Sequence, residues 1–290
     1  MTRILGQPFS RRAFLATAGA LALTPSISAK EPEKETYENQ ARGIRILPGQ
    51  WRPHYPWEHI AWISPAWPSQ DYLWFDFPEA IFSSQGLLFL SHINPPFPTV
   101  FQELPAVPWE KVEHGIRFER ALPNRIVFGG SLTKASETRV ATELFLRNGS
   151  AEPLRDITLQ TCVFLRAAKE FAAYTAENKF VHVPERGWIP FTEAKDAPEK
   201  EGLYRAGWRQ SGRPVADWPL MATRSSDAER YVLVSWGEHT LSMVSNPKHP
   251  CMHADPRFPD LEPGESASIQ GALIFHEGPL EEIKGTGNPG

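Results

Sequence analysis

Short runs of apolar or alternating residues, separated by Pro, Gly, Asn and Ser, follow one another from residue 43 onward. Their β-branched and aromatic content and their modest spacing are typical of strands. Helical patterns occur only over 167–175 and 280–284, and alternating β and α units are absent. The sequence therefore predicts an all-β fold, a large antiparallel β-sandwich with very little helix. The expected strands include 44–47, 60–63, 72–77, 86–91, 116–118, 126–128, 138–147, 157–166, 231–236, 240–245 and 268–276.

The longest of these runs are neighbours in the chain, at 138–147 and 157–166. In the first run Val140, Leu144 and Leu146 fall on alternate positions, as they do in a strand with one buried face. A polar Asn-Gly-Ser segment joins the two runs. We therefore expect them to pair as adjacent antiparallel strands.

The N-terminal pattern is different. Arg11 and Arg12 precede an apolar run that ends at Leu23, and small residues follow up to Ser28 and Ala29. This arrangement resembles a twin-arginine (Tat) export signal. The apolar run is too short to span a bilayer comfortably, and no later stretch approaches about 20 uninterrupted apolar residues.

The chain is accordingly divided into a Tat-type signal peptide over 1–29, a polar leader over 30–42 and a single β-sandwich domain over 43–290. Cleavage near the end of the signal would leave a periplasmic or secreted protein with no membrane association. Its partner during export would be the Tat translocase. An uncleaved membrane anchor is the alternative interpretation.

Charge and cysteine content exclude some classes of protein. The net charge is −4 with both signs interspersed, and no block of Lys and Arg offers a nucleic-acid surface. Cys162 and Cys251 are too few for a disulfide scaffold. One bridge between them is compatible with an oxidising compartment, and the sequence leaves open whether the two residues meet. A bridge would make Cys251 unavailable as a metal ligand.

The segment 246–260 gathers more metal-binding and proton-transferring groups than any other. An extended backbone would place its alternate residues on one face. Its four prolines exclude a helix and argue against a central strand, so we expect a stiff extended loop at a sheet edge or pocket rim. The alternate residues are His249, Cys251, His253 and Asp255, and the prolines are Pro247, Pro250, Pro256 and Pro259.

Three interpretations of this segment stay open. Two or three of His249, Cys251, His253 and Asp255 could bind a divalent metal such as zinc, which favours imidazole, thiolate and carboxylate ligands. The same residues could face a substrate without a metal, and the simplest cofactor prediction is none. Alternatively, the histidines satisfy backbone carbonyls and Cys251 is a small buried apolar residue.

A second candidate site lies at 178–188, where His182, Glu185, Arg186 and Trp188 come together. A His beside a Glu can transfer protons at a sugar, and an Arg can neutralise a carboxylate or a developing enolate. A surface loop with neighbouring opposite charges is the alternative.

A third candidate lies at 67–79, with Trp67 and Asp71 as substrate-binding residues; Asp71 and Glu79 would each project from a strand end. The chain has ten Trp, and an indole suits stacking on a sugar ring. Filling of the sandwich core is the alternative role for most of these rings.

The strand of 140–147, its Asn-Gly-Ser ending and the strand that restarts by Ile157 resemble the central segment of galactose mutarotase-like β-supersandwich proteins. Residues 261–266 and the strand 269–275 are similar to the closing segment of that superfamily. The resemblance implies a concave sheet face suited to carbohydrate. Aldose epimerases of the superfamily place a catalytic His shortly after the second strand, whereas 159–164 contains none, so mutarotase activity is not carried over.

These observations favour an exported carbohydrate-binding or carbohydrate-processing protein with a carbohydrate ligand. The first hypothesis is a sugar lyase or epimerase with His182, His249 or His253 as acid or base and Arg186 as anion stabiliser. It requires His182 and the segment around His249 to line one cleft. The alternatives are a non-catalytic carbohydrate-binding sandwich and a metal-dependent enzyme that uses the 249–255 residues.

Overall fold

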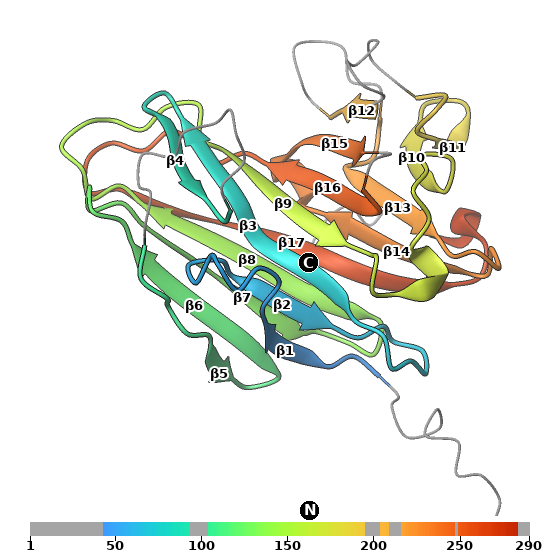
Figure 1. The fold of residues 1–290 in the computed structure, drawn as a ribbon. Helices are drawn as coiled ribbons and strands as arrows, with labels where there is room; N and C mark the ends of the chain where they lie inside the picture. Colours follow the sequence, from blue (N-terminus) through green and yellow to red (C-terminus); the bar gives the residue numbers. More distant parts are fainter. Residues whose placement is uncertain (1–42, 93–103, 195–203, 209–215, 247–248, 284–290) are drawn as a thin grey trace, which may run out of the picture. The chain divides into compact units, whose positions relative to one another are not determined.

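The computed structural model describes residues 43–92, 104–194, 204–208, 216–246 and 249–283. These residues form two large antiparallel sheets that pack as a β-sandwich (Figure 1). The predicted fold class is therefore confirmed. The predicted signal peptide (1–29) and leader (30–42) lie outside the described residues. Within the described part of the chain, no helix is long and apolar enough to cross a membrane.

The first sheet has eight strands, in the order β1, β2, β3, β9, β16, β15 and β12, and β4 pairs with the second half of β3. Its central strands carry the candidate site described below. The bounds are β1 Ile46–Gly49, β2 Ile60–Ile63, β3 Leu73–Ser83, β4 Gly86–Leu90, β9 Thr158–Phe164, β12 Tyr204–Gly207, β15 Thr240–Asn246 and β16 Cys251–Pro256.

The second sheet has nine strands, in the order β11, β10, β13, β14, β17, β8, β7, β6 and β5. The long strand β17 lies at its centre, between β14 and β8. The bounds are β5 Glu110–Val112, β6 Gly115–Ala121, β7 Val127–Lys134, β8 Arg139–Arg147, β10 Lys179–Val183, β11 Gly187–Pro190, β13 Leu220–Arg224, β14 Arg230–Ser235 and β17 Ser266–Glu277.

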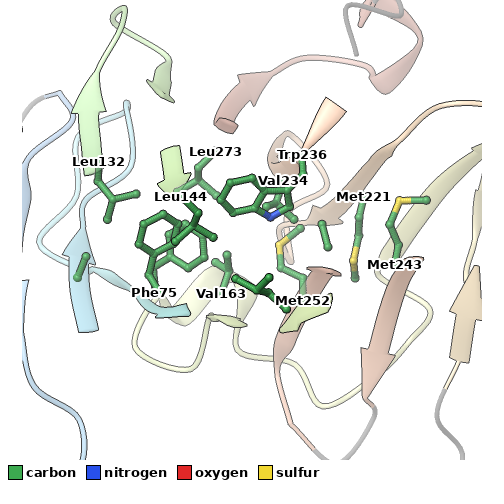
Figure 2. Close-up of a cluster of buried hydrophobic side chains, with 14 of the residues drawn as sticks. Phe75, Leu132, Leu144, Val163, Met221, Val234, Trp236, Met243, Met252 and Leu273 are labelled. Atoms are coloured by element: carbon green, nitrogen blue, oxygen red, sulfur yellow. The ribbon is translucent and has the colours of Figure 1, made fainter. Parts of the chain in front are cut away.

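The main core fills the space between the sheets. Alternate residues of each strand enter it, because successive side chains point to opposite faces. Figure 2 shows Val163 of β9 and Met252 of β16 meeting Leu144, Leu273 and other side chains of the second sheet. The residues at the alternate positions of these strands, such as Cys162 and Cys251, therefore point away from this core. They lie on what we call the outer face of the first sheet.

The predicted pairing of 138–147 with 157–166 is wrong. β8 pairs with β7 and β17 in the second sheet, whereas β9 pairs with β3 and β16 in the first. The connection crosses between the layers, and the buried Asn148 fixes it by donating to the carbonyls of Glu152 and Leu261. Both strands thus bury one face in the same core without pairing.

The 246–260 segment also differs from the prediction. Its central part is β16, which lies inside the first sheet between β9 and β15 and is not an edge loop. The prolines do not interrupt this strand, because Pro250 precedes it and Pro256 is its last residue. A proline at a strand end removes no internal ladder hydrogen bond.

The two expected helical segments contain single 3-10 turns, Lys169–Phe171 and Leu280–Glu282. A further 3-10 turn, Gly237–His239, precedes β15. The short strands β5 and β10 to β13 were not predicted from the sequence.

Candidate functional site

A pocket of about 430 Å³ lies on the outer face of the first sheet. Its floor consists of alternate residues of β9, β15 and β16, and one wall comes from the segment 50–59 between β1 and β2. The pocket is therefore built mainly on paired strands, which hold side chains more rigidly than loops do. Its lining residues are Trp51, Arg52, Glu79, His92, Gln160, Cys162, Phe164, Arg205, Val244, Asn246, His249, Cys251 and His253.

Two cysteines and a histidine occupy the floor. Cys251 and His253 are two residues apart on β16, so both point to the outer face. On β9, Phe164 pairs with Cys251 and Val163 with Met252, and one further step in this register places Cys162 opposite His253. Cys251 Sγ lies 3.4 Å from His253 Nε2. Both cysteines are buried and free.

Glu79 of β3 lies between two imidazoles. Its Oε1 is 3.8 Å from His92 Nε2, and its Oε2 is 3.7 Å from His253 Nδ1. Between Asp76 and Ala80, β3 advances four residues while β9 advances two, from Cys162 to Gln160. This irregularity lets Glu79 reach the outer face although it is three residues from Asp76, a spacing that regular alternation would place on opposite faces.

A hydrogen-bonded chain supports His92 from behind. Ser91 Oγ donates to Asp76 Oδ2 over 2.7 Å and lies 3.0 Å from His92 Nδ1. Since the single Ser91 hydroxyl proton goes to Asp76, His92 Nδ1 is the donor in the second contact and Nε2 keeps its lone pair. Arg52 completes the chain by donating to Asp76 over 3.1 Å.

Burial dominates the electrostatics of the carboxylates. It raises the pKa of Asp76 to about 8 against the opposing charge of Arg52. It also raises the pKa of Glu79, and it raises the pKa of Asp255 to about 6. Burial lowers the pKa of His92 to about 4, so this imidazole is neutral at physiological pH. These directions are those of groups that can exchange protons near neutrality.

The thiols and His253 form a separate charged pair. A hydrogen bond with Cys162 lowers the pKa of Cys251 well below its usual value and raises that of Cys162. Burial alone would lower the pKa of His253, but the Cys251 thiolate, Glu79 and Asp255 raise it to about 10. The favoured state is a thiolate beside an imidazolium.

An aromatic wall borders these groups. The Trp51 ring stacks on Phe164 with centroids 4.4 Å apart, and the Arg52 guanidinium lies 3.7 Å from the Trp51 ring centroid. The Glu58 carboxylate fixes this wall by accepting the backbone N–H groups of Trp51 and Arg52, each over 2.6 Å. The wall thus presents apolar ring surface next to a polar floor.

Four buried polar atoms at the site have no hydrogen-bond partner among the described residues. They are Asp76 Oδ1, Glu79 Oε2, His253 Nδ1 and Asp255 Oδ1. Buried polar atoms in folded proteins are nearly always paired, so atoms that are not paired by the protein mark a place for a bound group.

The structure separates the candidate residues predicted from the sequence. His249 and His253 line the pocket with Cys251, and Asp255 lies beside them, with Oδ1 4.0 Å from His253 Nδ1. His182 lies on the second sheet. It alternates with Val181 and Val183, which enter the main core, and so faces the opposite side of the sandwich.

The candidate residues that follow His182 in the sequence lie near it and away from the pocket. Trp188 packs against an apolar cluster on that side, and Arg186 forms an exposed ion pair with Glu193. Glu185 occupies the turn between β10 and β11 with φ 64°. The cleft expected to join His182 with the His249 segment is therefore not formed by the described residues.

The third predicted site has a structural role. Trp67 is 3% exposed, packs edge-on against Phe275 and donates from Nε1 to Glu170 over 2.7 Å. Asp71 accepts the backbone N–H of Lys169. Glu79 does not project from a strand end, since it lies within β3.

Sequence reasoning missed much of the pocket. Arg52, Gln160 and Phe164 carry no local signal. Strand pairing brings Gln160 and Phe164 of β9 to the pocket, and Arg52 reaches it from the segment between β1 and β2. His92 was not among the candidate residues, although the adjoining Ser91 is a usable sign of a hydrogen-bonded histidine. Cys162 was considered only as a disulfide partner.

No protein-family model matches the chain, and no curated protein matches it. The chain is similar to solved galactose mutarotase-like structures. The GalM/aldose epimerase homologue from C. elegans is 8% identical, with 81% of this chain and 100% of that chain covered and a TM-score of 0.43. Galactose 1-epimerase from Lactobacillus acidophilus is 9% identical, covering 81% and 99%, with a TM-score of 0.40.

A galactose mutarotase-like protein from Clostridium acetobutylicum is 12% identical, covering 86% of this chain and 84% of that chain, with a TM-score of 0.39. These structures belong to the group that the sequence resembles. The chemistry proposed below rests on the pocket residues alone.

Proposed function

We propose that this protein processes a carbohydrate by proton transfer in the pocket on the first sheet, as a sugar lyase or epimerase does. The observation that carries the proposal is the position of Glu79, whose two carboxylate oxygens lie 3.8 Å and 3.7 Å from the imidazoles of His92 and His253. Both distances exceed those of a hydrogen bond, as is common for acid and base groups before substrate binds.

Glu79 and His92 form the proton-transferring pair. His92 offers a free lone pair at Nε2, and the hydrogen bonds through Ser91 to Asp76 hold its ring in this orientation. Glu79 holds a proton more readily than an exposed carboxyl does, because burial raises its pKa. The positive charge of His253 beside Oε2 stabilises the ionised form of Glu79 when it gives the proton away.

In the proposed reaction one member of the pair removes a proton from a sugar C–H next to a carbonyl or carboxylate. The electron pair of that bond moves onto the carbonyl oxygen, where Arg52 and Arg205 at the pocket wall stabilise the negative charge. Return of a proton to the other face of the carbon gives an epimer. Expulsion of a glycosidic oxygen from the adjacent carbon, protonated by the partner group, gives an unsaturated sugar.

The volume and lining of the pocket support a sugar as substrate. About 430 Å³ accommodates a small ligand, and the Trp51 ring provides an apolar platform next to hydrogen-bonding groups. A non-catalytic carbohydrate-binding protein would need the platform but not the buried Glu79 and His92.

The test is incubation of the purified protein with neutral sugars, uronic acids and polyuronates in D₂O, followed by proton NMR. We expect deuterium incorporation at one sugar carbon, or an unsaturated product, in at least one case. Glu79→Gln should reduce the rate by about 10²–10⁴-fold. The control Glu113→Gln, which changes an exposed carboxylate, should leave the rate unchanged. Binding without exchange or cleavage in the whole panel would contradict the proposal.

We also propose that the protein acts after export, as the twin arginines at 11 and 12 indicate. Replacing both by lysine should leave the full-length precursor in the cytoplasm of a bacterium that has the Tat translocase. Arg3→Lys is the matched control and should still be exported. Equal processing of the double variant and the wild type, measured by fractionation and intact mass, would contradict this assignment.

A further inference from the structure

The pocket floor combines three strong metal ligands on two paired strands. Cys162 Sγ, Cys251 Sγ and one ring nitrogen of His253 all lie within 4.8 Å of one another. Cys251 and His253 share the outer face of β16, and Cys162 lies opposite His253 on β9. The strand ladder therefore fixes all three side chains.

We infer that Cys162, Cys251 and His253 bind a single thiophilic metal ion, with zinc as the probe of choice. Zinc and copper(I) bind readily to two sulfurs and one imidazole, whereas magnesium and calcium favour oxygen ligands. This ligand set differs from the one expected from the sequence, because Cys162 takes the place of His249 and Asp255. The inference does not rest on the proposed carbohydrate chemistry.

The spacing of the ligands suits a tetrahedral ion. Zinc bonds of about 2.3 Å to sulfur and about 2.0–2.1 Å to nitrogen give a sulfur–nitrogen edge of about 3.6 Å in a tetrahedron. The observed Cys251 Sγ to His253 Nε2 distance is 3.4 Å. Metal binding thus requires only small side-chain adjustments within 4.8 Å and no change in strand register.

The other nitrogen of His253 faces a carboxylate, as it does in many zinc sites. Nε2 faces Cys251, whereas Nδ1 lies 3.7 Å from Glu79 Oε2. Nδ1 and Oε2 are both buried, and no described residue hydrogen-bonds to either of them. A metal-bound histidine usually donates its second ring N–H to such a carboxylate, which orients the ring and strengthens the ligand. Metal on Nε2 would fix the proton on Nδ1, where this partner lies.

A disulfide explains the arrangement less well. Cys162 lies opposite His253, so Cys251 is its diagonal neighbour across the ladder and not its direct one. Diagonal positions are about 7–8 Å apart between Cα atoms, which is beyond the usual disulfide range. Three protein ligands would leave the fourth position of a tetrahedral ion for a further ligand.

The test uses the full chain, purified without an affinity tag, reduced and stripped of metal. Titration with zinc in a chelator buffer should show one equivalent bound, and cobalt(II) should give the intense thiolate-to-cobalt charge-transfer absorption of a two-sulfur site. Cys162→Ser and Cys251→Ser should each lose the site, whereas the controls His249→Ala and Asp255→Asn should keep it. Glu79→Gln should weaken binding about 10–100-fold.

Three results would overturn the inference: no zinc binding by the reduced wild type, cobalt binding without the charge-transfer band, or zinc binding that survives both cysteine substitutions. The cobalt spectrum of the wild type decides the matter even if a serine variant fails to fold, which thermal unfolding would reveal. Since metal binding is measured without sugar, its failure is distinct from failure of the carbohydrate assay.

Discussion

The outer faces of the two sheets both carry a histidine next to tryptophan and a carboxylate, yet they differ in how those groups are satisfied. On the second sheet, His182 Nδ1 lies 2.7 Å from Asp217 and the ring stacks on Trp218 with centroids 3.7 Å apart. On the first sheet, His253 Nδ1 and Glu79 Oε2 are buried and find no hydrogen-bond partner within the described part of the chain. Composition alone does not distinguish the two histidines, whereas the hydrogen bonds that they make do.

The hydrogen bonds of a buried histidine indicate whether it has a structural role or belongs to a binding site. A histidine with a complete hydrogen bond and a stacked ring is explained by its contribution to stability. A histidine that lines a pocket and lies 3.7 Å from a carboxylate is better explained by a bound group that contacts one or both of these side chains.

The largest expected difference is between the histidines of the two faces. His92→Asn should lower turnover by about 10²-fold or more, because it removes the Nε2 lone pair opposite Glu79. His182→Asn should leave turnover unchanged and lower the free energy of unfolding by about 1 kcal/mol, because it removes the ring that stacks on Trp218. Steady-state kinetics and denaturant titration of both variants provide the check; equal loss of turnover would remove the distinction.

A second comparison concerns the pH dependence of stability. The folded pKa of Asp76, about 8, lies above its value of 3.8 in an unfolded chain. Its contribution is therefore fully present below about pH 4 and is lost as pH rises through about 8. Asp76→Asn should flatten the decline of the unfolding free energy across this window, by an amount on the order of a few kcal/mol.

Urea titrations at several pH values provide this measurement, and the exposed Asp156 supplies a matched control. Asp156→Asn should keep the wild-type slope. An Asp76→Asn protein whose stability still declines with the wild-type slope would show that Asp76 is not the group that titrates.

The smallest effect is expected at the aromatic walls. Trp51→Ala should weaken sugar binding by about 1 kcal/mol, or about fivefold, since it removes the platform beside the pocket. Trp188→Ala, on the other face, should not change the affinity. Isothermal titration with the sugar found by NMR measures both, and a loss at Trp188 alone would assign binding to the second sheet.

Part of this architecture follows from local sequence pattern. Alternation of Cys251, His253 and Asp255 correctly predicted that they share one face, because side-chain direction in a strand depends only on residue spacing. The fold class followed in the same way from many short runs. Both conclusions need information only from neighbouring residues.

The remainder depends on register, which no local pattern contains. Cys162 meets His253 because β9 and β16 pair with one particular offset, although 91 residues separate them in the chain (253 − 162). Glu79 reaches the pocket through an irregularity in β3. The antiparallel pairing expected for β8 and β9 failed because two strands with equal alternation can belong to either layer.

The division of the pocket between floor and wall has a consequence for how its specificity could change. The floor belongs to paired strands in the middle of a sheet, whereas Trp51 and Arg52 belong to the segment 50–59, which Glu58 closes upon itself. Substitutions in that segment, apart from Arg52, can alter the shape presented to a ligand while the reacting groups keep their positions. A directed-evolution library at 50, 51 and 53–57, with Arg52 retained, would therefore explore new substrates without changing the proposed catalytic groups.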